Sequence, residues 1–362
     1  MFRLRSLITA GALTAAALTV PLLTAASSSA TTSAATSSAA GSGQARSASW
    51  GRLPGHIFAP YFEAYLKGSP AAVAAASGAR YLTLAFIQTP KKGSCSIDWN
   101  GDKATPISWS VYGSDIAAIR AAGGDVIPSF GGYSADHDGT EIADSCHSVP
   151  KIAAAYEKVI TTYHVTRLDL DTEDNSLTNK AGINRRNAAI HLVEQWAARC
   201  HRHVQFVYTL PTNVAGLDPT GVNVLRSAVA HHARIDIVNI MTFDYYDNKP
   251  HEMARDTMTA AGHLLRTLHQ LYPMKSATRL WHMIGVTEMI GIDDFGPPEV
   301  FKLKDGPVVL HWATAKGLGE LSFWALQRDN GGCPGTAGSN TCSGLKQSTW
   351  QFTHIFEPFT RW

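Results

Sequence analysis

Charge is almost absent from the first 49 residues of this 362-residue chain. They contain no Asp, Glu or Lys, and their charged side chains are Arg3, Arg5 and Arg46. Arg3 and Arg5 precede an uncharged, mostly apolar run over residues 7–26, and small residues follow at 27–30. This order is typical of a secretory signal peptide, which we place at residues 1–30. A membrane anchor is the alternative, but the run is rich in Ala, Gly and Thr and no basic cluster follows it. We therefore expect a secreted, extracellular protein.

Residues 31–49 lack the large apolar side chains that a folded core needs. Ser, Ala, Thr and Gly make up nearly all of this segment. Such a composition cannot bury enough apolar surface to order itself, so we predict a flexible leader. The remaining residues, 50–362, are expected to form one folded domain that carries the chemistry.

The chain has no surplus of charge of either sign. Its 31 Lys and Arg against 29 Asp and Glu give a formal net charge of +2. Nucleic acids and anionic membranes usually require a basic surplus on their partners, so neither is expected. We predict a neutral or small substrate, no membrane contact in the mature form, and a monomer.

The five cysteines include no C-x-x-C pair, which disfavours a zinc site. Export permits disulfide bonds. Cys333 and Cys342 enclose a short segment rich in Gly, Ser and Asn and are predicted to pair. Cys95 and Cys146 lie in polar loops and are predicted to form a second bond, which leaves Cys200 as the odd thiol.

After residue 50, short runs rich in β-branched and aromatic residues alternate with helical segments. The predicted strands cover residues 57–62, 81–87, 125–130, 165–173, 204–210, 235–243, 280–286 and 321–326. The clearest predicted helices cover residues 152–163, 183–198, 222–230, 253–271 and 308–316. This α/β alternation indicates a parallel sheet, and eight such units favour a closed (β/α)8 TIM barrel. An open doubly wound sheet is the alternative, but the Gly-rich phosphate loop that usually follows its first strand is missing.

Three acidic residues occupy alternate positions near the end of the fourth predicted strand: Asp169, Asp171 and Glu173. Because strand side chains alternate, the acids share one face, while Leu168 and Leu170 share the other. In a barrel the leucines would meet the covering helices, and Glu173 would lie nearest the C-terminal mouth, where active sites of this architecture lie. Close carboxylates raise one another's pKa, so we expect a shared proton and a general acid that keeps its proton near neutral pH.

Three other interpretations of this acidic ladder are weaker. An exposed antiparallel strand could alternate acids in the same way, but the flanking helices argue against exposure. A calcium loop would need Gly where Asp174 stands and Glu where Lys180 stands. A divalent-metal site would need further ligands at neighbouring strand ends, and none is obvious, so no metal is expected.

The ladder resembles the motif D-G-x-D-x-D-x-E of glycoside hydrolase family 18, the chitinase family. The resemblance implies that Glu173 is the catalytic acid and that Asp171 orients the acetamido group of the substrate. It also implies that Asp169 shares a proton with Asp171. The match is partial, because Thr166 and Arg167 stand where the motif has Asp and Gly.

Segments at three other strand ends resemble the same family. Ser129-Phe130-Gly131-Gly132 is similar to S-x-G-G, Met241-Thr242-Phe243-Asp244 to M-x-Y-D, and Ser322-Phe323-Trp324 to the segment whose Trp lies beneath the central sugar. The residues that we assign to substrate binding are Tyr61, Gly131, Gly132, Met241, Asp244 and Trp324.

Phe243 departs from the family, because it lacks the hydroxyl of the Tyr that normally binds the acetamido group. On a continued strand Tyr245 would share a face with Phe243, and we predict that Tyr245 supplies the hydroxyl and joins the catalytic residues. Tyr246 is an alternative donor, and both tyrosines could instead be ordinary loop aromatics. The segment resembles a bacterial, chitinase D-like branch of the family in which M-T-x-D-Y is usual.

The resemblance implies an enzyme without metal or organic cofactor that hydrolyses chitin or chito-oligosaccharides. It would cut β-1,4-linked N-acetylglucosamine polymers internally by a substrate-assisted, retaining mechanism. Two alternatives stay open: a lectin-like barrel that binds glycans without cutting them, and a hydrolase of another glycan that contains N-acetylglucosamine. Loss of the acid usually marks the non-catalytic barrels, and here Glu173 is present.

Overall fold

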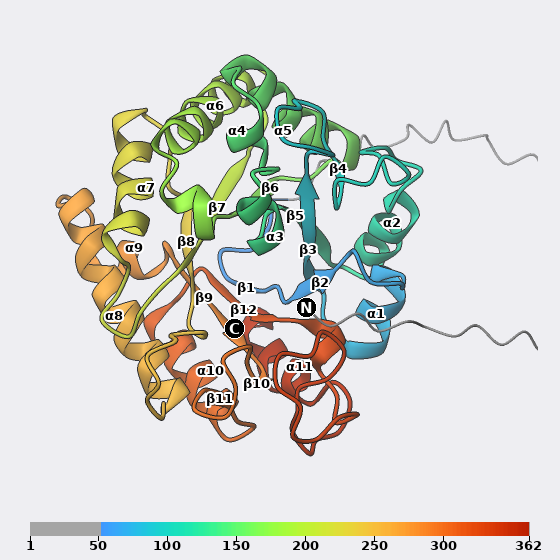
Figure 1. The fold of residues 1–362 in the computed structure, drawn as a ribbon, viewed down its shortest axis with the longest axis vertical. Helices are drawn as coiled ribbons and strands as arrows, with labels where there is room; N and C mark the ends of the chain where they lie inside the picture. The colour runs from blue at the N-terminus through green and yellow to red at the C-terminus, as the bar shows by residue number, and fades with distance from the viewer. Residues whose placement is uncertain (1–51, 362) are drawn as a thin grey trace, which may run out of the picture. The chain divides into compact units, whose positions relative to one another are not determined.

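The computed structural model describes residues 52–361, so the predicted signal peptide and leader lie outside the described residues. Parallel strands form a closed ring in the order β1-β12-β9-β8-β7-β6-β5-β3-β2 (Figure 1). The strands are β1 (Ile57–Phe58), β2 (Tyr61–Glu63), β3 (Tyr81–Gln88), β5 (Asp125–Gly131), β6 (Arg167–Asp171), β7 (Gln205–Pro211), β8 (Ile237–Met241), β9 (Ile284–Met289) and β12 (Glu320–Trp324). Three short strands lie outside the ring: β4 (Asp98–Trp99), β10 (Gly291–Ile292) and β11 (Val300–Phe301).

The barrel closes through its first chain segment, which is split at Ala59 and Pro60. β1 pairs with β12 and β2 pairs with β3, so this one segment joins the two ends of the sheet. Pro60 has no N–H to offer a neighbouring strand. The carbonyl of Ala59 accepts the hydroxyls of Thr83 and Ser322, at 3.1 and 2.8 Å, from the strands on either side. The predicted (β/α)8 barrel is therefore confirmed, and the open sheet is excluded.

Helices surround the ring of strands (Figure 1). The longer ones are α1 (Pro70–Ser77), α2 (Gly113–Ala121), α5 (Val149–Tyr163), α6 (Lys180–Arg199), α7 (Pro219–Ala230), α8 (Met253–Leu271) and α10 (Asp305–Lys316). The shorter ones are α3 (Tyr133–Asp138), α4 (Ile142–Ser145), α9 (Ala277–Trp281) and α11 (Gln351–Phe356). All five predicted helices occur. Between residues 52 and 361 no helix has the length and apolar character needed to span a membrane.

The predicted strand at 280–286 is wrong at its start, because Leu280 lies in α9 and β9 begins at Ile284. Ser276 caps α9 by accepting the N–H of Arg279 at 3.3 Å. The apolar residues at the start of the predicted strand therefore close a helical turn, since a Ser cap satisfies a backbone donor of the first turn.

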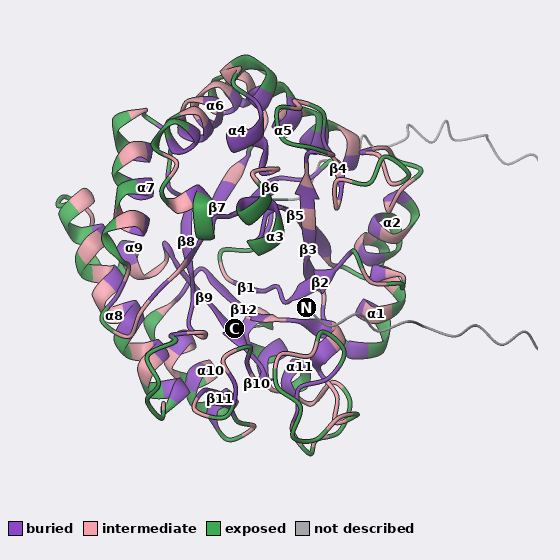
Figure 2. Ribbon diagram, viewed as in Figure 1, coloured by how far each residue is buried: buried purple, intermediate pink, exposed green. Residues whose placement is uncertain are grey.

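The core lies between the strands and the helices. Leu168 and Leu170 of β6 are 0% and 1% exposed and pack in this layer, as their alternation with the acids predicts. Figure 2 shows the same division, with buried strands and helices exposed on their outer sides. The opposite side chains of β6 are thus free to point into the barrel.

Two disulfide bonds join the predicted cysteine pairs. Cys95 binds Cys146 across 51 residues, and Cys333 binds Cys342 across nine, with Cα–Cα distances of 4.7 and 5.9 Å. Cys200 is free and exposed. All five cysteines fall within the described residues, so the predicted assignment is confirmed.

Candidate active site

The acidic ladder runs along the inner face of β6 toward the mouth of the barrel. Asp169 and Asp171 are 1% and 4% exposed. β6 ends at Asp171, but Glu173 keeps an extended backbone, with φ −130° and ψ −177°. The alternation of side chains therefore continues for one more step, and Glu173 lies on the same side as the two aspartates.

Asp169 is surrounded by hydroxyl donors. Its Oδ2 accepts hydrogen bonds from Ser129 at 2.6 Å and Tyr61 at 3.0 Å, and its Oδ1 accepts one from Thr209 at 2.6 Å. Burial raises the pKa of Asp169 to about 6, and these three bonds hold it below what burial alone would give. Asp169 is therefore the carboxyl of the ladder best suited to carry charge.

Asp171 has the opposite environment. Its Oδ1 is buried and has no hydrogen-bond partner among the described residues. Burial, then the charges of Glu173, Asp169 and Asp136, raise its pKa well above the ordinary value. These causes favour the protonated form of Asp171, and its unpartnered oxygen is available to a group that enters from outside.

Glu173 has the properties of a general acid. Burial raises its pKa to about 7, and the charge of Asp244 is the next largest cause. The backbone N–H of Tyr133 opposes this shift, because it favours the charged carboxylate. Asp244, predicted to bind substrate, thus acts on Glu173, and its own pKa is raised to about 7 by burial and by Asp294.

Three aromatic rings lie together beside the ladder. Phe86 stacks on Trp324 with ring centroids 5.7 Å apart and an interplanar angle of 12°. The ring of Tyr61 lies 5.6 Å from that of Trp324. Trp324 is half-buried, as expected for a ring beneath a sugar. Tyr61, predicted to bind substrate, is only 2% exposed, and its hydroxyl donates to Asp169 of the ladder.

Gly131 and Gly132, which were assigned to substrate binding, lie close to other parts of the protein. A Cβ on Gly131 would lie 2.0 Å from the carbonyl oxygen of Asp171, and one on Gly132 would lie 2.5 Å from the ring of Phe86. Both glycines also have positive φ, 97° and 83°. Side chains at these two positions would collide with β6 and with the ring of Phe86, so glycine is needed there.

Met241, also predicted to bind substrate, lies at the end of β8 and is 7% exposed.

The predicted position of Tyr245 beside the ladder is wrong. That prediction required a continued strand, but β8 ends at Met241 and Asp244 takes a positive φ of 52°, which breaks the alternation. Tyr245 instead packs on the ring of His251, with centroids 4.8 Å apart, and its buried hydroxyl has no partner in the described part of the chain. Tyr246 is 58% exposed and packs edge-on against Phe295, so it remains the alternative donor.

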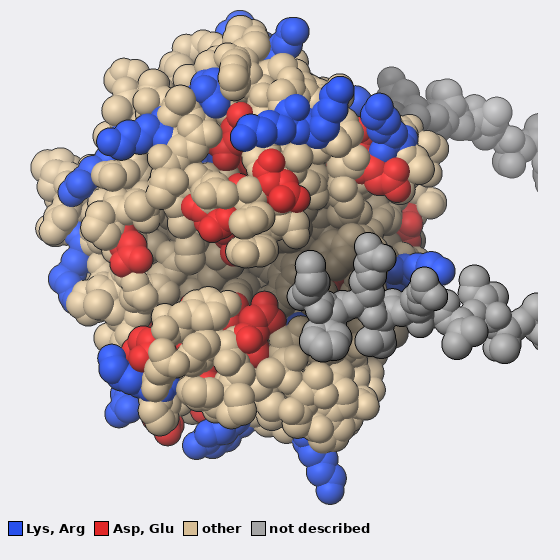
Figure 3. Space-filling model, in the orientation of Figure 1, with Lys and Arg blue, Asp and Glu red and all other residues tan. Residues whose placement is uncertain are grey.

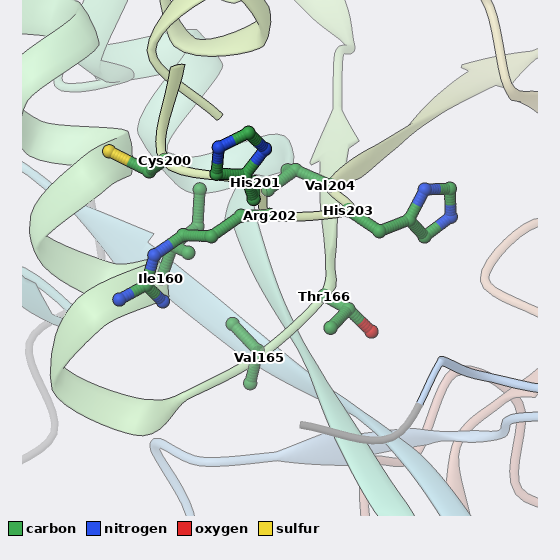
Figure 4. A pocket seen from close by; sticks show the side chains of 8 residues that line it. All are labelled: Ile160, Val165, Thr166, Cys200, His201, Arg202, His203 and Val204. Atoms are coloured by element: carbon green, nitrogen blue, oxygen red, sulfur yellow. The ribbon is translucent and has the colours of Figure 1, made fainter. Parts of the chain in front are cut away.

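The two residues that depart from the family motif are Arg167, the first residue of β6, and Thr166, which precedes it. Arg167 stands where the motif has Gly, and its guanidinium crosses the barrel to Glu320 at 2.8 Å, with both side chains 2% exposed. Thr166, in place of the motif's Asp, borders a cavity of about 370 Å³ beneath the barrel (Figure 4). Cys200 and His203, which also line it, point in opposite directions. No residue of the ladder lines this cavity, because the ladder leads to the other end of β6.

Several residues of the site were not predicted. Ser129 and Thr209 bind Asp169, and Phe86 stacks on Trp324. Asp136 accepts the backbone N–H of Glu173. Ser129 belongs to the S-x-G-G segment, so its motif was a usable signal, whereas Asp136 lies in the following short helix and carries no pattern that sets it apart.

The face at the C-terminal ends of the strands is hollowed at its centre. Figure 3 shows Asp and Glu side chains bordering this hollow, while Lys and Arg lie nearer the periphery. A general acid with a raised pKa beside a second buried carboxyl is the arrangement that glycosidases use, and the half-buried Trp324 offers an aromatic face to a sugar. The fold and the site together define a glycoside hydrolase of the TIM-barrel class.

Curated relatives match most of the chain. A probable bifunctional chitinase/lysozyme of Escherichia coli (strain K12) is 32% identical over 322 residues, which cover 85% of this chain and 35% of the relative. Endochitinase 11 of Metarhizium anisopliae is 32% identical over 289 residues, which cover 76% of this chain and 53% of the relative. The chain therefore spans only part of the length of these two proteins. No protein-family model matches it.

Solved structures match over nearly their full length. The catalytic domain of a hyperthermophilic chitinase from Pyrococcus furiosus is 31% identical, with a TM-score of 0.75, and the match covers 86% of this chain and 96% of that structure. Catalytic-site mutants of that chitinase's active domain 2, complexed with chito-oligosaccharides, match with a TM-score of 0.74 at 30% identity. The chain belongs to glycoside hydrolase family 18, the chitinase family. Its place in a chitinase D-like branch stays a prediction.

Proposed function

We propose that this protein is a secreted chitinase that cuts β-1,4-linked N-acetylglucosamine polymers internally, with retention at the anomeric carbon. The observation that carries the proposal is the ladder itself. Asp169 accepts three hydroxyl hydrogen bonds, and Asp171 has a raised pKa and presents a buried oxygen that has no partner among the described residues. Burial raises the pKa of Glu173 to about 7.

Each carboxyl would have one part in the reaction. Glu173 donates its proton to the glycosidic oxygen as the bond to the anomeric carbon breaks. The carbonyl oxygen of the substrate's own acetamido group attacks that carbon and forms a positively charged oxazolinium. Asp171 accepts the acetamide N–H through its free oxygen and, as the shared proton moves to Asp169, stabilises this charge as a carboxylate. Glu173 then takes a proton from water, which adds to the anomeric carbon and restores the acetamide.

The bound sugar would lie on Trp324. Its half-buried ring is held by Phe86 and Tyr61, which fix its orientation. Apolar faces of pyranose rings pack on such aromatic surfaces. The P. furiosus structure with chito-oligosaccharides supports this class of ligand.

Secretion and internal cleavage have separate support. The residues before 50 have the pattern of a signal peptide, and two disulfide bonds suit an oxidising compartment. The M. anisopliae relative is named an endochitinase. A second candidate activity, cleavage of peptidoglycan, is favoured by one observation, the name chitinase/lysozyme of the E. coli relative.

Incubation of the protein with chitohexaose, followed by chromatography of the products, tests the proposal. We expect internal products whose new reducing ends are first β-anomers, seen by NMR. Glu173→Gln should lower kcat about 10²- to 10⁴-fold, because a general acid contributes that much, while calorimetry still detects binding of chitohexaose.

Glu252→Gln is the matched control, because this exposed glutamate precedes α8 and lies outside the ladder. Full activity of Glu173→Gln would refute the assigned acid. Binding without cleavage by the unaltered protein would indicate a lectin-like barrel, and release of fragments from peptidoglycan but not from chitohexaose would favour the second activity.

A further inference from the structure

A buried carboxylate outside the ladder holds the backbone of the catalytic acid. Asp136 lies in α3, the short helix that follows Gly131 and Gly132, and is 0% exposed. Its Oδ2 accepts the backbone N–H of Glu173. The side chain thus reaches away from its own helix to the chain segment that leaves β6.

The contact between α3 and Glu173 is reciprocal. While the carboxylate of Asp136 accepts the main-chain N–H of Glu173, the main-chain N–H of Tyr133 faces the carboxylate of Glu173. Helix starts have free N–H groups, and acidic side chains are favourable partners for them. α3 therefore fixes Glu173 at two points, one on its backbone and one on its side chain.

Asp136 gains little from this position for stability alone. No ion pair is formed by Asp136 among residues 52–361, since the nearby Arg186 pairs with Glu141 at 2.9 Å. Its Oδ1 is buried with no hydrogen-bond partner in the same part of the chain. Burial and the charge of Glu141 raise its pKa, and Arg186 opposes them. Burial of a polar side chain is costly unless its bonds repay it, so an acceptor that is fully buried and bonds the backbone N–H of Glu173 indicates a role at that residue.

We propose that Asp136 is a positioning residue, which accepts the backbone N–H of Glu173 and so aims its carboxyl group at the glycosidic oxygen of the substrate. The inference rests on the proposed function of Glu173. A hydrogen bond to the backbone of a catalytic residue acts on its placement, and a misplacement of about 1 Å can cost a factor of about 100 in rate.

Asp136→Ala tests the proposal by steady-state kinetics on chitohexaose. We expect kcat to fall about 10- to 100-fold with KM changed less than about twofold, because the sugar-binding surface at Trp324 is untouched. Asp136→Asn should recover kcat to within about threefold of the unaltered protein, since its amide oxygen can accept the same N–H. Asp138→Ala is the matched control, because Asp138 lies in the same helix, is exposed, and should leave kcat unchanged.

Asp136→Leu carries the test if Asp136→Ala does not fold, because Leu fills a similar volume without an acceptor. A kcat of Asp136→Ala equal to that of the unaltered protein would overturn the inference. So would a failure of both apolar variants to fold, or an Asn variant that folds but is as slow as the Ala variant. Failure of the unaltered protein to cleave chitohexaose would instead overturn the function of Glu173, so the two failures are distinguishable.

Discussion

At the scale of single residues, the carboxyl groups of the site differ in the donors that surround them. Asp169 has three hydroxyl donors and Asp171 has a buried oxygen with none in the described residues. Glu173 has a backbone N–H on one side and the charge of Asp244 on the other. These surroundings separate the pKa values of chemically similar groups, which lets one carboxyl act as an acid while another stays charged.

The pH dependence of cleavage should report the pKa of Glu173. An exposed Glu loses its proton near pH 4.5, but burial and the charge of Asp244 raise the pKa of Glu173 to about 7. The acid must be protonated to act, so kcat/KM should hold up to about pH 7 and then fall about tenfold for each further pH unit. Initial rates on a chromogenic chitobioside between pH 4 and 9 measure this fall, which is the alkaline limb of the pH profile.

Asp244→Asn is the informative variant for that experiment. Removal of a negative charge near Glu173 makes its ionisation easier, so the limb should move to lower pH. A limb that stays in place in Asp244→Asn, or one that lies near pH 4.5 in the unaltered protein, would contradict the environment assigned to Glu173.

The inward face of β6 could be predicted because strand alternation is a local property of the sequence. The contact of Asp136 with Glu173 could not, since it joins α3 to the segment after β6, and these are brought together only by the folded barrel. Tyr245 was misplaced for a related reason. The positive φ of Asp244 turns the chain after β8, and the residue types of this segment do not predict that turn.

At the scale of elements, the first residue of β6 replaces a family glycine with a long cation. Arg167 fills the lower barrel and is held by Glu320 at 2.8 Å and by the amide oxygen of Gln205 at 3.0 Å. Burial outweighs the attraction of Arg167 and raises the pKa of Glu320 to about 7. The carboxyl group of Glu320 is therefore mostly charged only above that pH.

Glu320→Gln should destabilise the protein strongly at pH 8. The change leaves the guanidinium of Arg167 buried without its counter-charge, which typically costs about 3–5 kcal/mol of the free energy of unfolding. Urea unfolding followed by circular dichroism measures the loss. Replacement of both residues by Leu should recover much of the lost free energy of unfolding. A Glu320→Gln variant as stable as the unaltered protein would show that Glu320 does not stabilise the buried charge of Arg167.

The order and type of the elements followed from hydrophobic periodicity, because long amphipathic helices such as α5 and α8 carry a clear pattern. Boundaries were less predictable. The start of β9 was misplaced because Leu280 and Trp281 suit a strand by composition, while the cap at Ser276 makes them helical. The interruption between β1 and β2 depends on closure of the whole sheet, so local sequence could not reveal it.

At the scale of the whole molecule, two covalent links close loops of very different length. The Cys95–Cys146 bond spans 51 residues and the Cys333–Cys342 bond spans nine. In the chain-entropy description a disulfide stabilises the folded state by restricting the unfolded chain, and the effect grows slowly with loop length. The longer loop should therefore contribute more.

Removal of each bond by a double Cys→Ala change should reveal that difference. We expect losses of about 4 kcal/mol for Cys95–Cys146 and about 2.5 kcal/mol for Cys333–Cys342 in the free energy of unfolding. Chemical denaturation of the two variants provides the comparison, with Cys200→Ala as the control that removes a thiol but no link. Equal losses, or a larger loss for the shorter loop, would show that strain or local packing outweighs loop entropy.

Cys200 has one further consequence. It follows α6 and precedes β7, so it lies at the end of the barrel where the strands begin. The structure describes all five cysteines, and Cys200 is the one that is free and exposed. The carboxylate ladder opens where the strands end. A thiol-reactive support would therefore attach every molecule by the same point and in the same orientation, with its catalytic face turned outward toward an insoluble polymer in the surrounding suspension.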